Sequence, residues 1–465
     1  MRLAKLFFTL ATLLTLTACG GDSDSGSTPS VEMEAPVMVS STPANGAIDI
    51  PAGNLTIKMT YDQNISSPNN THNSVSIDNG ASITSVSAAF KVLTIEVTGL
   101  AKGKTYTVRV PKGVVLGPTQ LEANQVAVSF STVEEIALSN KLVTQNPLPQ
   151  AQKVFDYLVD IYGEKTLSCA IANVNWNTAE ANLVYKATGK YPAMNCFDYI
   201  HLPYSPANWI DYTNTKVAED WWNAGGLVAA CWHWNVPLSE TNTQNHTCTP
   251  SETTFRAKNI FVEGSWEQKT ADADLEKMAD MLLLLQDKGI PVIWRPLHEA
   301  AGNTYEYNGG TAWFWWGYDG AEVYVKLWRY MFDYFKAKGV NNLIWVWTTQ
   351  EKDAPFYPGD DYVDIIGRDL YGADYNNEKD AAQNASHFSA IQQNYSHKLI
   401  TLSECGSVGK ISQQWSAGAR WSWFMPWYQY DASTLDGHQH ADTNWWKDAM
   451  SQDFVVTRDQ LPSFK

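Results

Sequence analysis

The C-terminal two thirds of the chain alternates between short apolar runs and longer amphipathic stretches. Each run is apolar at consecutive positions, which is typical of a parallel strand covered on both faces. The expected strands are Thr166–Ile171, Ala193–Phe197, Leu227–His233, Val292–Pro296, Leu343–Thr348, Val363–Asp369, Leu399–Ser403 and Trp421–Trp427. Between them, helices are expected at Ala179–Thr188, Ala273–Lys288, Ala321–Lys338 and Ala381–Asn394. A glycine follows three of these helices, as is common at helix C-termini.

Eight strand-plus-helix repeats between about residue 134 and residue 465 predict an α/β fold, a closed (β/α)8 barrel with some long loops. An open, doubly wound parallel sheet is the alternative. It is disfavoured because no glycine-rich phosphate-binding loop follows the first expected strand.

Residues 36–133 show a different pattern, in which apolar and polar positions alternate with a period of two. Short strands are expected at Leu55–Tyr61, Val75–Ile77, Leu93–Val97, Tyr106–Val110 and Val126–Phe130, and turn residues separate them. This spacing is typical of a β-sandwich and resembles the bacterial Ig-like domains that accompany secreted enzymes. The segment carries no catalytic cluster, so we interpret it as a spacer; glycan binding is the alternative role.

The first 18 residues have the pattern of an export signal. Two basic residues, Arg2 and Lys5, precede the apolar segment Leu6–Leu16. The sequence Leu16-Thr-Ala-Cys19-Gly20 resembles a bacterial lipobox, which implies cleavage before Cys19 and acylation of its thiol. Residues 19–35 are then a flexible tether, rich in Gly, Ser, Asp and Pro. The sequence thus predicts a membrane-anchored lipoprotein at the cell surface or facing the periplasm. An ordinary signal peptide is the alternative.

Composition narrows the classes of partner and cofactor. The 465-residue chain has a formal net charge of −16, which disfavours nucleic acid as a partner. Its 20 Trp and 22 Tyr residues are unusually many, and aromatic rings either stack on sugars or fill cores. Five cysteines follow Cys19 without a CxxC spacing, so a structural zinc site is not expected. A bridge between Cys231 and Cys248 stays open.

Polar side chains gather where the expected strands end, and a (β/α)8 barrel carries its active site at that end. They are Asp198, His201, His233, Trp234, Arg295, His298, Glu299, Asp369, Tyr371, Glu404 and Trp427. Two carboxyl groups, Glu299 after the fourth strand and Glu404 after the seventh, are placed to face each other across the barrel mouth. Such a pair cleaves glycosidic bonds, with retention of configuration when the carboxyl groups are about 5–5.5 Å apart.

Other interpretations apply to single residues of this set. Asp369 follows Arg368, so a structural ion pair between these neighbours is the favoured interpretation of that carboxylate. His233 and His298 are possible metal ligands, but no HExxH motif or similar helical spacing supports a metal, and none is expected.

Several motifs together resemble glycoside hydrolase family 26, whose members are mostly endo-β-1,4-mannanases. The motifs are Arg295-Pro-Leu-His-Glu299, Trp313-Phe-Trp-Trp-Gly317, Asn195-Cys-Phe-Asp-Tyr199, Trp232-His-Trp234, Asp369-Leu-Tyr371 and Ser403-Glu404. The resemblance covers about residue 140 to the C-terminus. It implies a (β/α)8 barrel and a retaining double displacement on mannan, galactomannan or glucomannan, without a cofactor.

The resemblance also implies a role for individual residues. Glu299 corresponds to the acid/base and Glu404 to the nucleophile, and Tyr371 to a tyrosine that hydrogen-bonds the nucleophile. The implied substrate-binding residues are His298, His233, Trp313, Tyr371, Trp427, Asp198 and Arg295. The chain departs from the family pattern in the longer loop between Glu299 and Trp313, which affects the alignment of Trp313.

Two alternative functions remain from the sequence. One is cleavage of a different β-glycan, such as mixed-linkage glucan or xylan, on the same fold. The other is a surface lipoprotein that binds glycans through a degenerate enzyme domain, which the two intact carboxyl groups disfavour.

Overall fold

The computed structural model describes residues 34–133, 138–173, 176–372 and 378–465. The expected signal peptide, Cys19 and the expected tether up to residue 33 lie outside these residues, as does the expected domain boundary near residue 134. The chain forms two compact units, divided between Glu135 and Ile136. Each unit is described by itself below.

The N-terminal unit is an Ig-like β-sandwich of two four-stranded sheets, which confirms the predicted fold. One sheet has the order β1 (Met38–Thr42), β3 (Gly53–Tyr61), β6 (Val92–Leu100), β5 (Ser82–Ala89). The other has the order β2 (Ala47–Ile50), β8 (Val126–Thr132), β7 (Thr105–Val110), β4 (Ser76–Ile77). Alternate residues such as Ile57, Met59, Tyr106 and Val108 are fully buried, because the core lies on one face of each sheet.

The C-terminal unit is a closed barrel of eight parallel strands, as predicted. The strands are β9 (Thr166–Ile171), β10 (Met194–Asp198), β11 (Leu227–Trp232), β14 (Val292–Pro296), β15 (Leu343–Thr349), β16 (Ile365–Tyr371), β17 (Leu399–Gly406) and β18 (Trp423–Pro426). Each pairs with the next in chain order, and β18 pairs with β9 to close the ring. The strands are almost entirely buried, which explains their continuous apolar sequences.

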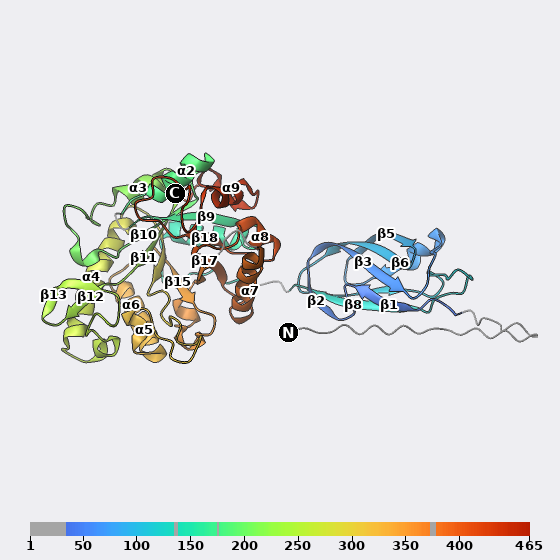
Figure 1. Cartoon of the computed structure of the whole chain (residues 1–465), viewed down its shortest axis with the longest axis horizontal. Coiled ribbons are helices and arrows are strands. Elements are labelled where there is room, and N and C mark those ends of the chain that lie inside the picture. Colours follow the sequence, from blue (N-terminus) through green and yellow to red (C-terminus); the bar gives the residue numbers. More distant parts are fainter. Residues whose placement is uncertain (1–33, 134–137, 174–175, 373–377) are drawn as a thin grey trace, which may run out of the picture. The chain divides into compact units, whose positions relative to one another are not determined.

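Helices surround the barrel strands in Figure 1. They are α1 (Pro149–Ile161), α2 (Ala179–Thr188), α3 (Lys216–Asn223), α4 (Trp266–Gln286), α5 (Trp315–Tyr318), α6 (Ala321–Ala337), α7 (Glu378–Asn394), α8 (Ile411–Ser416) and α9 (Thr443–Ser451). The helix expected from Ala273 begins earlier, at Trp266, because the Ser265 side chain accepts a hydrogen bond from the Gln268 amide and caps it.

Two additions to the barrel were not predicted. A hairpin of β12 (Val236–Ser239) and β13 (Asn242–Thr247) extends from the end of β11, and the short strand β19 (Val455–Val456) pairs with β9. The hairpin lies at the carboxyl end of the strands, where the barrel carries its functional loops.

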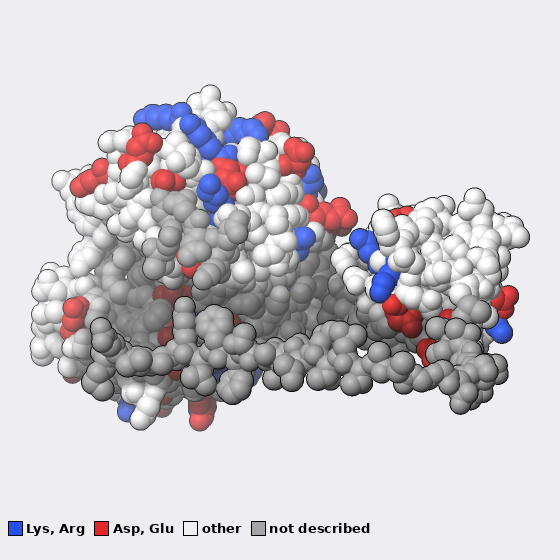
Figure 2. Space-filling view, turned by 45° about the vertical axis from the view of Figure 1, so that its right-hand side comes forward, with Lys and Arg blue, Asp and Glu red and all other residues white. Residues whose placement is uncertain are grey.

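Three further observations concern the cysteines, the length of the helices and the surface charges. Cys231 and Cys248 are not bridged, and the cysteines that the structure describes are all free thiols. No helix among the described residues has the length and apolar character required to cross a bilayer. Acidic and basic side chains lie interspersed on the face of the barrel unit shown in Figure 2.

Candidate active site

Arg295 is the central residue of a buried ionic network at the mouth of the barrel. It ends β14, and its two terminal nitrogens bind two carboxylates: Nη1 lies 2.9 Å from Asp369 Oδ2, and Nη2 lies 2.6 Å from Glu404 Oε2. Asp369 and Glu404 are register partners on the neighbouring strands β16 and β17. One guanidinium therefore neutralises two adjacent carboxylates that would otherwise repel each other.

The pairing between β16 and β17 is irregular at this point. Arg368 pairs with Leu402, but the next residue, Asp369, pairs with Glu404, so Ser403 is an extra residue on β17. The Ser403 hydroxyl donates to Asp369 Oδ1 at 2.7 Å. A local bulge of this kind re-aims the following side chain, and here that side chain is Glu404.

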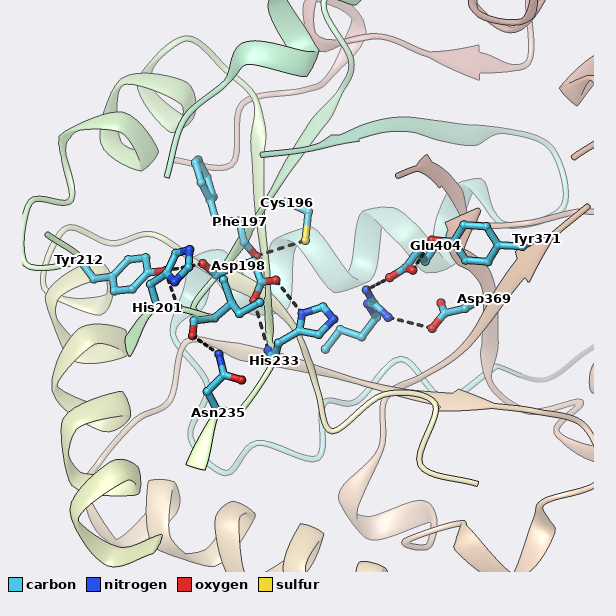
Figure 3. A network of polar contacts seen from close by, with 12 residues as sticks. Cys196, Phe197, Asp198, His201, Tyr212, His233, Asn235, Asp369, Tyr371 and Glu404 are labelled. Carbon is cyan, nitrogen blue, oxygen red and sulfur yellow. Dashed lines mark hydrogen bonds and ion pairs between the residues drawn. The ribbon is translucent and has the colours of Figure 1, made fainter. Parts of the chain in front are cut away.

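Glu404 has a second donor on its other oxygen. The Tyr371 hydroxyl donates to Glu404 Oε1 at 2.5 Å, while about half of the Tyr371 side chain is exposed. Together with Arg295, this bond fixes both carboxylate oxygens (Figure 3). Burial, opposed by Arg295 and reinforced by Glu404, raises the pKa of Asp369 to about 6.

The expected ion pair between Asp369 and Arg368 is wrong. Consecutive strand residues point to opposite sides, so Asp369 faces Arg295 inside the mouth while Arg368 binds Glu351 at 3.0 Å. Asp369 is thus part of the candidate active site rather than of a separate structural pair.

Glu299 follows β14 on a backbone with two unusual conformations. Leu297 and Glu299 have φ angles of 49° and 50°, in the left-handed region that non-glycine residues rarely adopt. Helices α5 and α6 hold this turn from outside: Trp316 Nε1 donates to the His298 carbonyl and Tyr324 Oη to the Leu297 carbonyl, each at 2.9 Å. These contacts hold the backbone of the turn that carries Glu299.

Gly317 lets α5 come close enough to make these contacts. A Cβ at this position would lie 1.7 Å from the Ala300 carbonyl oxygen. A larger residue would push α5 away from the turn that carries Glu299. The close packing of α5 against Ala300 therefore explains why the Trp-Phe-Trp-Trp-Gly motif ends in glycine.

The surroundings of Glu299 change the pKa of its carboxyl group. Burial and the nearby charges of Asp369 and Glu404 raise the pKa of Glu299 well above its ordinary value, although Arg295 and His233 oppose this. The raised pKa of Glu299 suits a group that donates a proton, and the two hydrogen bonds on Glu404 suit a carboxyl group held in one orientation. Two carboxyl groups with separate roles are the requirement for general acid and nucleophilic catalysis at one centre.

His233 and His298 lie next to each other, with ring centroids 4.4 Å apart. Burial disfavours the charged form of His233, but Asp198, whose Oδ2 lies 2.6 Å from His233 Nδ1, raises the pKa of His233 well above its ordinary value. Burial, Arg295 and His233 lower the pKa of His298 well below its ordinary value. One imidazole is therefore a cation held by Asp198, and the other is a neutral ring.

His298 carries a buried ring nitrogen without a hydrogen-bond partner in the described part of the chain. Its side chain is 1% exposed, and Nδ1 has no hydrogen-bond partner among the residues that the structure describes. A buried, unpaired polar atom is costly unless a ligand binds it. The expectation that His298 binds substrate stays a prediction that this geometry supports.

Three further predicted residues are Trp427, Trp313 and His201, and a ring contact joins Trp427 to His233. Trp427 is half-buried, with its ring centroid 5.8 Å from that of His233, and its amide donates to the Cys405 carbonyl. Trp313 is 40% exposed. His201 is joined to Asp198 through Tyr212, whose hydroxyl donates to the Asp198 carbonyl at 2.9 Å and accepts from the His201 amide at 3.2 Å (Figure 3).

Phe314 was not predicted as a site residue, yet its ring lies beside His298 and His233. Its ring stacks on Trp316 at 4.4 Å and faces His298 and His233 at 5.3 and 5.8 Å. Phe314 lies in the motif that begins at Trp313, and Trp313 was the residue of that motif predicted to contact substrate. Trp315 and Trp316 are fully buried and act as packing residues.

Among the residues that the structure describes, Asp198, Cys231 and His233 have ligand atoms close enough to hold a metal ion, within 4.8 Å of one another. The Asp198 and His233 atoms already satisfy each other at 2.6 Å, the distance of a charge-assisted hydrogen bond. Burial raises the pKa of the Cys231 thiol well above its ordinary value, and the neighbouring Asp198 charge adds to this. A protonated thiol is a poor ligand, so these residues fit an ion pair better than a metal site.

Comparisons with known proteins agree with this chemistry. Residues 143–460 match the profile described as "Glycosyl hydrolase family 26", and residues 32–132 match "Bacterial Ig-like domain". A mannan endo-1,4-beta-mannosidase A from Piromyces sp is 31% identical over 337 residues, which is 70% of this chain and 51% of that protein. The chain spans about half the length of the first curated relatives that it matches.

Two solved structures are similar to the barrel unit. The GH26 domain of an endo-beta-mannanase/endo-beta-glucanase from Prevotella bryantii is 40% identical, with a TM-score of 0.64 over 70% of this chain and 100% of that one. A beta-mannanase from a symbiotic protist of the termite Reticulitermes speratus, complexed with gluco-manno-oligosaccharide, is 33% identical, with a TM-score of 0.60 over 71% and 99% of the two chains. On the match over residues 143–460, this chain belongs to glycosyl hydrolase family 26.

Proposed function

We propose that this protein is an endo-β-1,4-mannanase that hydrolyses mannan, galactomannan or glucomannan with retention of anomeric configuration. The observation that carries the proposal is a pair of carboxyl groups in different surroundings: Glu299, whose pKa is raised, and Glu404, whose two oxygens accept hydrogen bonds from Arg295 and Tyr371. Support for the substrate comes from relatives that are named as mannanases.

In the first step, protonated Glu299 donates its proton to the glycosidic oxygen as the bond to the leaving sugar breaks. The Glu404 carboxylate attacks the anomeric carbon and forms a glycosyl-enzyme ester. Arg295 and Tyr371 hold the two carboxylate oxygens, so the nucleophile is oriented before the substrate binds.

In the second step, Glu299 acts as a base. Once Glu404 is esterified, its negative charge is gone, and one of the charges that raise the pKa of Glu299 is removed. Glu299 then accepts a proton from water, and the resulting hydroxide attacks the same carbon and releases Glu404. Two inversions at one carbon give net retention.

The neighbouring histidines act on the sugar. The neutral, unpaired His298 is placed to hydrogen-bond a hydroxyl group, and the His233 cation is held in position by Asp198. Trp427, Trp313 and Phe314 supply apolar ring faces for the sugar rings.

Release of reducing sugar from linear mannan, galactomannan, glucomannan, mixed-linkage glucan and xylan tests this function. We expect the β-1,4-mannose polymers to be cleaved and the anomeric configuration of the first product, followed by NMR, to be β. If only glucan or xylan were cleaved, that glycan and not mannan would be the substrate. An α product would exclude the double displacement, and no cleavage of any glycan would favour a binding protein.

We propose in addition that Cys19 is lipidated and tethers the enzyme to a membrane. The support is the lipobox-like sequence Leu16-Thr-Ala-Cys19-Gly20 after an apolar segment. Metabolic labelling with palmitate in a bacterial host should label the wild type but not the Cys19→Ala variant. Protease treatment of intact cells then separates surface display from a periplasmic location. Equal labelling of both proteins would exclude this anchor.

A further inference from the structure

Of the two side chains that bind Glu404, Tyr371 is the more exposed. Its hydroxyl donates to Glu404 Oε1 (Figure 3), yet about half of its side chain is exposed, whereas Arg295 is buried. A half-exposed ring keeps one position only where neighbouring atoms restrict its rotamers. The neighbours of the Tyr371 ring therefore decide how often its hydroxyl reaches Glu404.

The Tyr371 ring lies beside a glycine on the next strand. Tyr371 of β16 and Gly406 of β17 are register partners, and the Gly372 amide donates to the Gly406 carbonyl at 2.9 Å. A Cβ at position 406 would lie 2.7 Å from two carbon atoms of the Tyr371 ring. Glycine within a strand commonly marks such a close approach. Gly406 thus leaves the space that the ring occupies.

His440 borders the same space. A Cβ at position 406 would also collide with His440 Nδ1, and the centroids of the His440 and Tyr371 rings are 5.6 Å apart at an interplanar angle of 78°. Aromatic rings pack favourably in this edge-to-face arrangement. Among the residues that the structure describes, His440 is the aromatic residue whose ring contacts Tyr371. The two rings thus share the space beside Gly406.

Hydrogen bonds fix the backbone of His440. This residue lies in the loop between β18 and α9, residues 427–442, and its carbonyl accepts from the Ser407 amide at 2.9 Å. The amides of His440 and Ala441 both donate to His438 Nδ1 at 3.2 Å. Ser407 directly follows β17, so the loop is attached to the end of the strand that carries Glu404.

A buried pair of side chains anchors the same loop to α2. His438 is 3% exposed, and its Nε2 lies 3.4 Å from Oε2 of Glu180, which belongs to α2. The other carboxylate oxygen of Glu180 accepts from the Gln429 amide at 3.0 Å. Because His438 Nδ1 accepts two amide hydrogen bonds, the proton of its neutral ring lies on Nε2 and faces Glu180. The loop is therefore held by α2 as well as by the end of β17.

The His440 ring is uncharged at neutral pH. Burial and the neighbouring His438 lower the pKa of His440 below its ordinary value, although Glu404 and Glu180 oppose this. The side-chain nitrogen of Gln439 lies 2.6 Å from His440 Nε2 and can only donate, so Nε2 is an unprotonated acceptor. Packing of the ring, rather than a positive charge, is therefore what His440 contributes beside Glu404.

We infer that His440 is a positioning residue for Glu404: its ring holds the Tyr371 ring beside Gly406 and so keeps the Tyr371 hydroxyl on the carboxylate. This inference rests on the proposed function, in which Glu404 is the nucleophile. His440 acts through Tyr371 and needs no contact with the sugar. Its replacement should therefore affect the chemical steps rather than substrate binding.

A double-mutant cycle tests this role. The kcat and KM on glucomannan are compared for the wild type, His440→Ala, Tyr371→Phe and the double variant. His440→Ala should lower kcat about 3- to 10-fold, as for loss of one aromatic pair, and change KM less than about twofold. In the Tyr371→Phe background no hydroxyl is left to position, so the same change should lower kcat less than about twofold. An equal factor in both backgrounds would overturn the inference, as would unchanged kcat or an effect on KM alone.

Further variants separate packing from a general loss of structure. His440→Phe keeps a ring and should recover most of kcat, whereas Gly406→Ala places a methyl group where the two rings lie and should lower kcat as His440→Ala does. The matched control is His397→Ala, in a partly exposed histidine that precedes β17 at the amino end of the barrel and should leave kcat unchanged. Circular dichroism checks each fold. A His440→Phe variant as slow as His440→Ala, or wild-type kcat in folded Gly406→Ala, would overturn the inference.

Crystal structures of the wild type, His440→Ala and His397→Ala separate failure of this inference from failure of the proposed function, because they need no turnover. In His440→Ala, the Tyr371 hydroxyl should occupy a second position or lie beyond hydrogen-bond distance of Glu404 Oε1, and in the other two proteins it should stay on Glu404. If the wild type cleaves no glycan, the proposed function fails, yet a displaced Tyr371 hydroxyl would still support the role of His440. An undisplaced hydroxyl in His440→Ala would overturn that role.

Discussion

Nη2 of Arg295 lies 2.6 Å from Oε2 of Glu404, and both side chains are buried at the barrel mouth. A carboxylate in this position requires a fixed cation, because water does not solvate it. Arg295 serves this purpose for Asp369 as well. The Glu404 carboxyl group is therefore held in one orientation before any substrate binds, and the roles proposed for the surrounding residues follow from this pairing.

Replacement of Glu404 by Ala should abolish hydrolysis and leave the fold intact. Arg295 keeps its bond to Asp369, so no isolated charge remains buried. Loss of the nucleophile should lower kcat by roughly 10⁴-fold or more, as for other enzymes with a covalent intermediate. Reducing-sugar release gives the activity, and circular dichroism gives the fold. Wild-type activity in a folded variant would refute the assignment.

Replacement of Glu299 by Ala should affect the two steps differently. Substrates with good leaving groups need no acid for the first step, so the glycosyl-enzyme should accumulate. Azide, a small nucleophile that needs no base, should then restore turnover and give a glycosyl azide of retained configuration. Mass spectrometry and NMR identify this product. If azide gives neither faster turnover nor a glycosyl azide, Glu299 is not the acid/base.

Replacement of Tyr371 by Phe should slow catalysis without preventing substrate binding. The change removes the hydroxyl that donates to Glu404 Oε1 at 2.5 Å and keeps the ring. Because a hydrogen bond to a charged group contributes roughly 1.5–3 kcal/mol, kcat should fall about 10- to 100-fold. Tyr185→Phe, which makes the same change on the exposed face of α2, serves as the control. An equal effect in both variants would argue against a role for the Tyr371 hydroxyl.

The pKa of Glu299 also predicts how stability depends on pH. This pKa is raised in the folded protein above the ordinary value of about 4.3, so the folded state binds a proton that the unfolded state releases. The stabilising contribution of Glu299 is then complete below pH 4 or so and is lost as pH rises through the raised pKa. Once the pH exceeds this raised pKa, the side chain is ionised beside Asp369 and Glu404 and destabilises the fold.

Thermal unfolding of Glu299→Gln measures this effect. The Tm of the variant should exceed that of the wild type at neutral pH, and the difference should shrink as pH falls below the ordinary glutamate range. The alkaline limit of kcat/KM in the wild type should lie above that range, because deprotonation of Glu299 removes the acid. A difference in Tm that is constant across pH would contradict the raised pKa.

The sequence was sufficient to predict the eight barrel strands, because buried parallel strands are continuous apolar runs. It also predicted that Glu299 follows the fourth strand, as observed, and that Glu404 follows the seventh, whereas β17 continues to Gly406 and includes Glu404. Helix α3 and the β12–β13 hairpin were missed: the helix is short, and the hairpin sequence Asn242–Thr247 is polar throughout. Local patterns of this kind carry little periodicity.

The contacts within the site were harder to predict. The predicted partner of Asp369 was wrong because it was chosen as the sequence neighbour, Arg368. The actual partner, Arg295, comes from another strand, two positions away in the barrel. The extra residue Ser403 on β17 depends on the register between strands, which no single segment encodes. Phe314 has no distinguishing feature among the aromatic residues of its motif.

The turn that carries Glu299 depends on helices outside the barrel. Trp316 and Tyr324 each donate one hydrogen bond to its backbone, and that backbone holds two residues with positive φ. The position of Glu299 is thus coupled to the docking of α5 and α6 rather than to the barrel strands alone. On heating, detachment of these helices would let the turn relax and misdirect the carboxyl group before the strands separate. Loss of activity would then precede global melting and act as an early indicator of local unfolding in this enzyme.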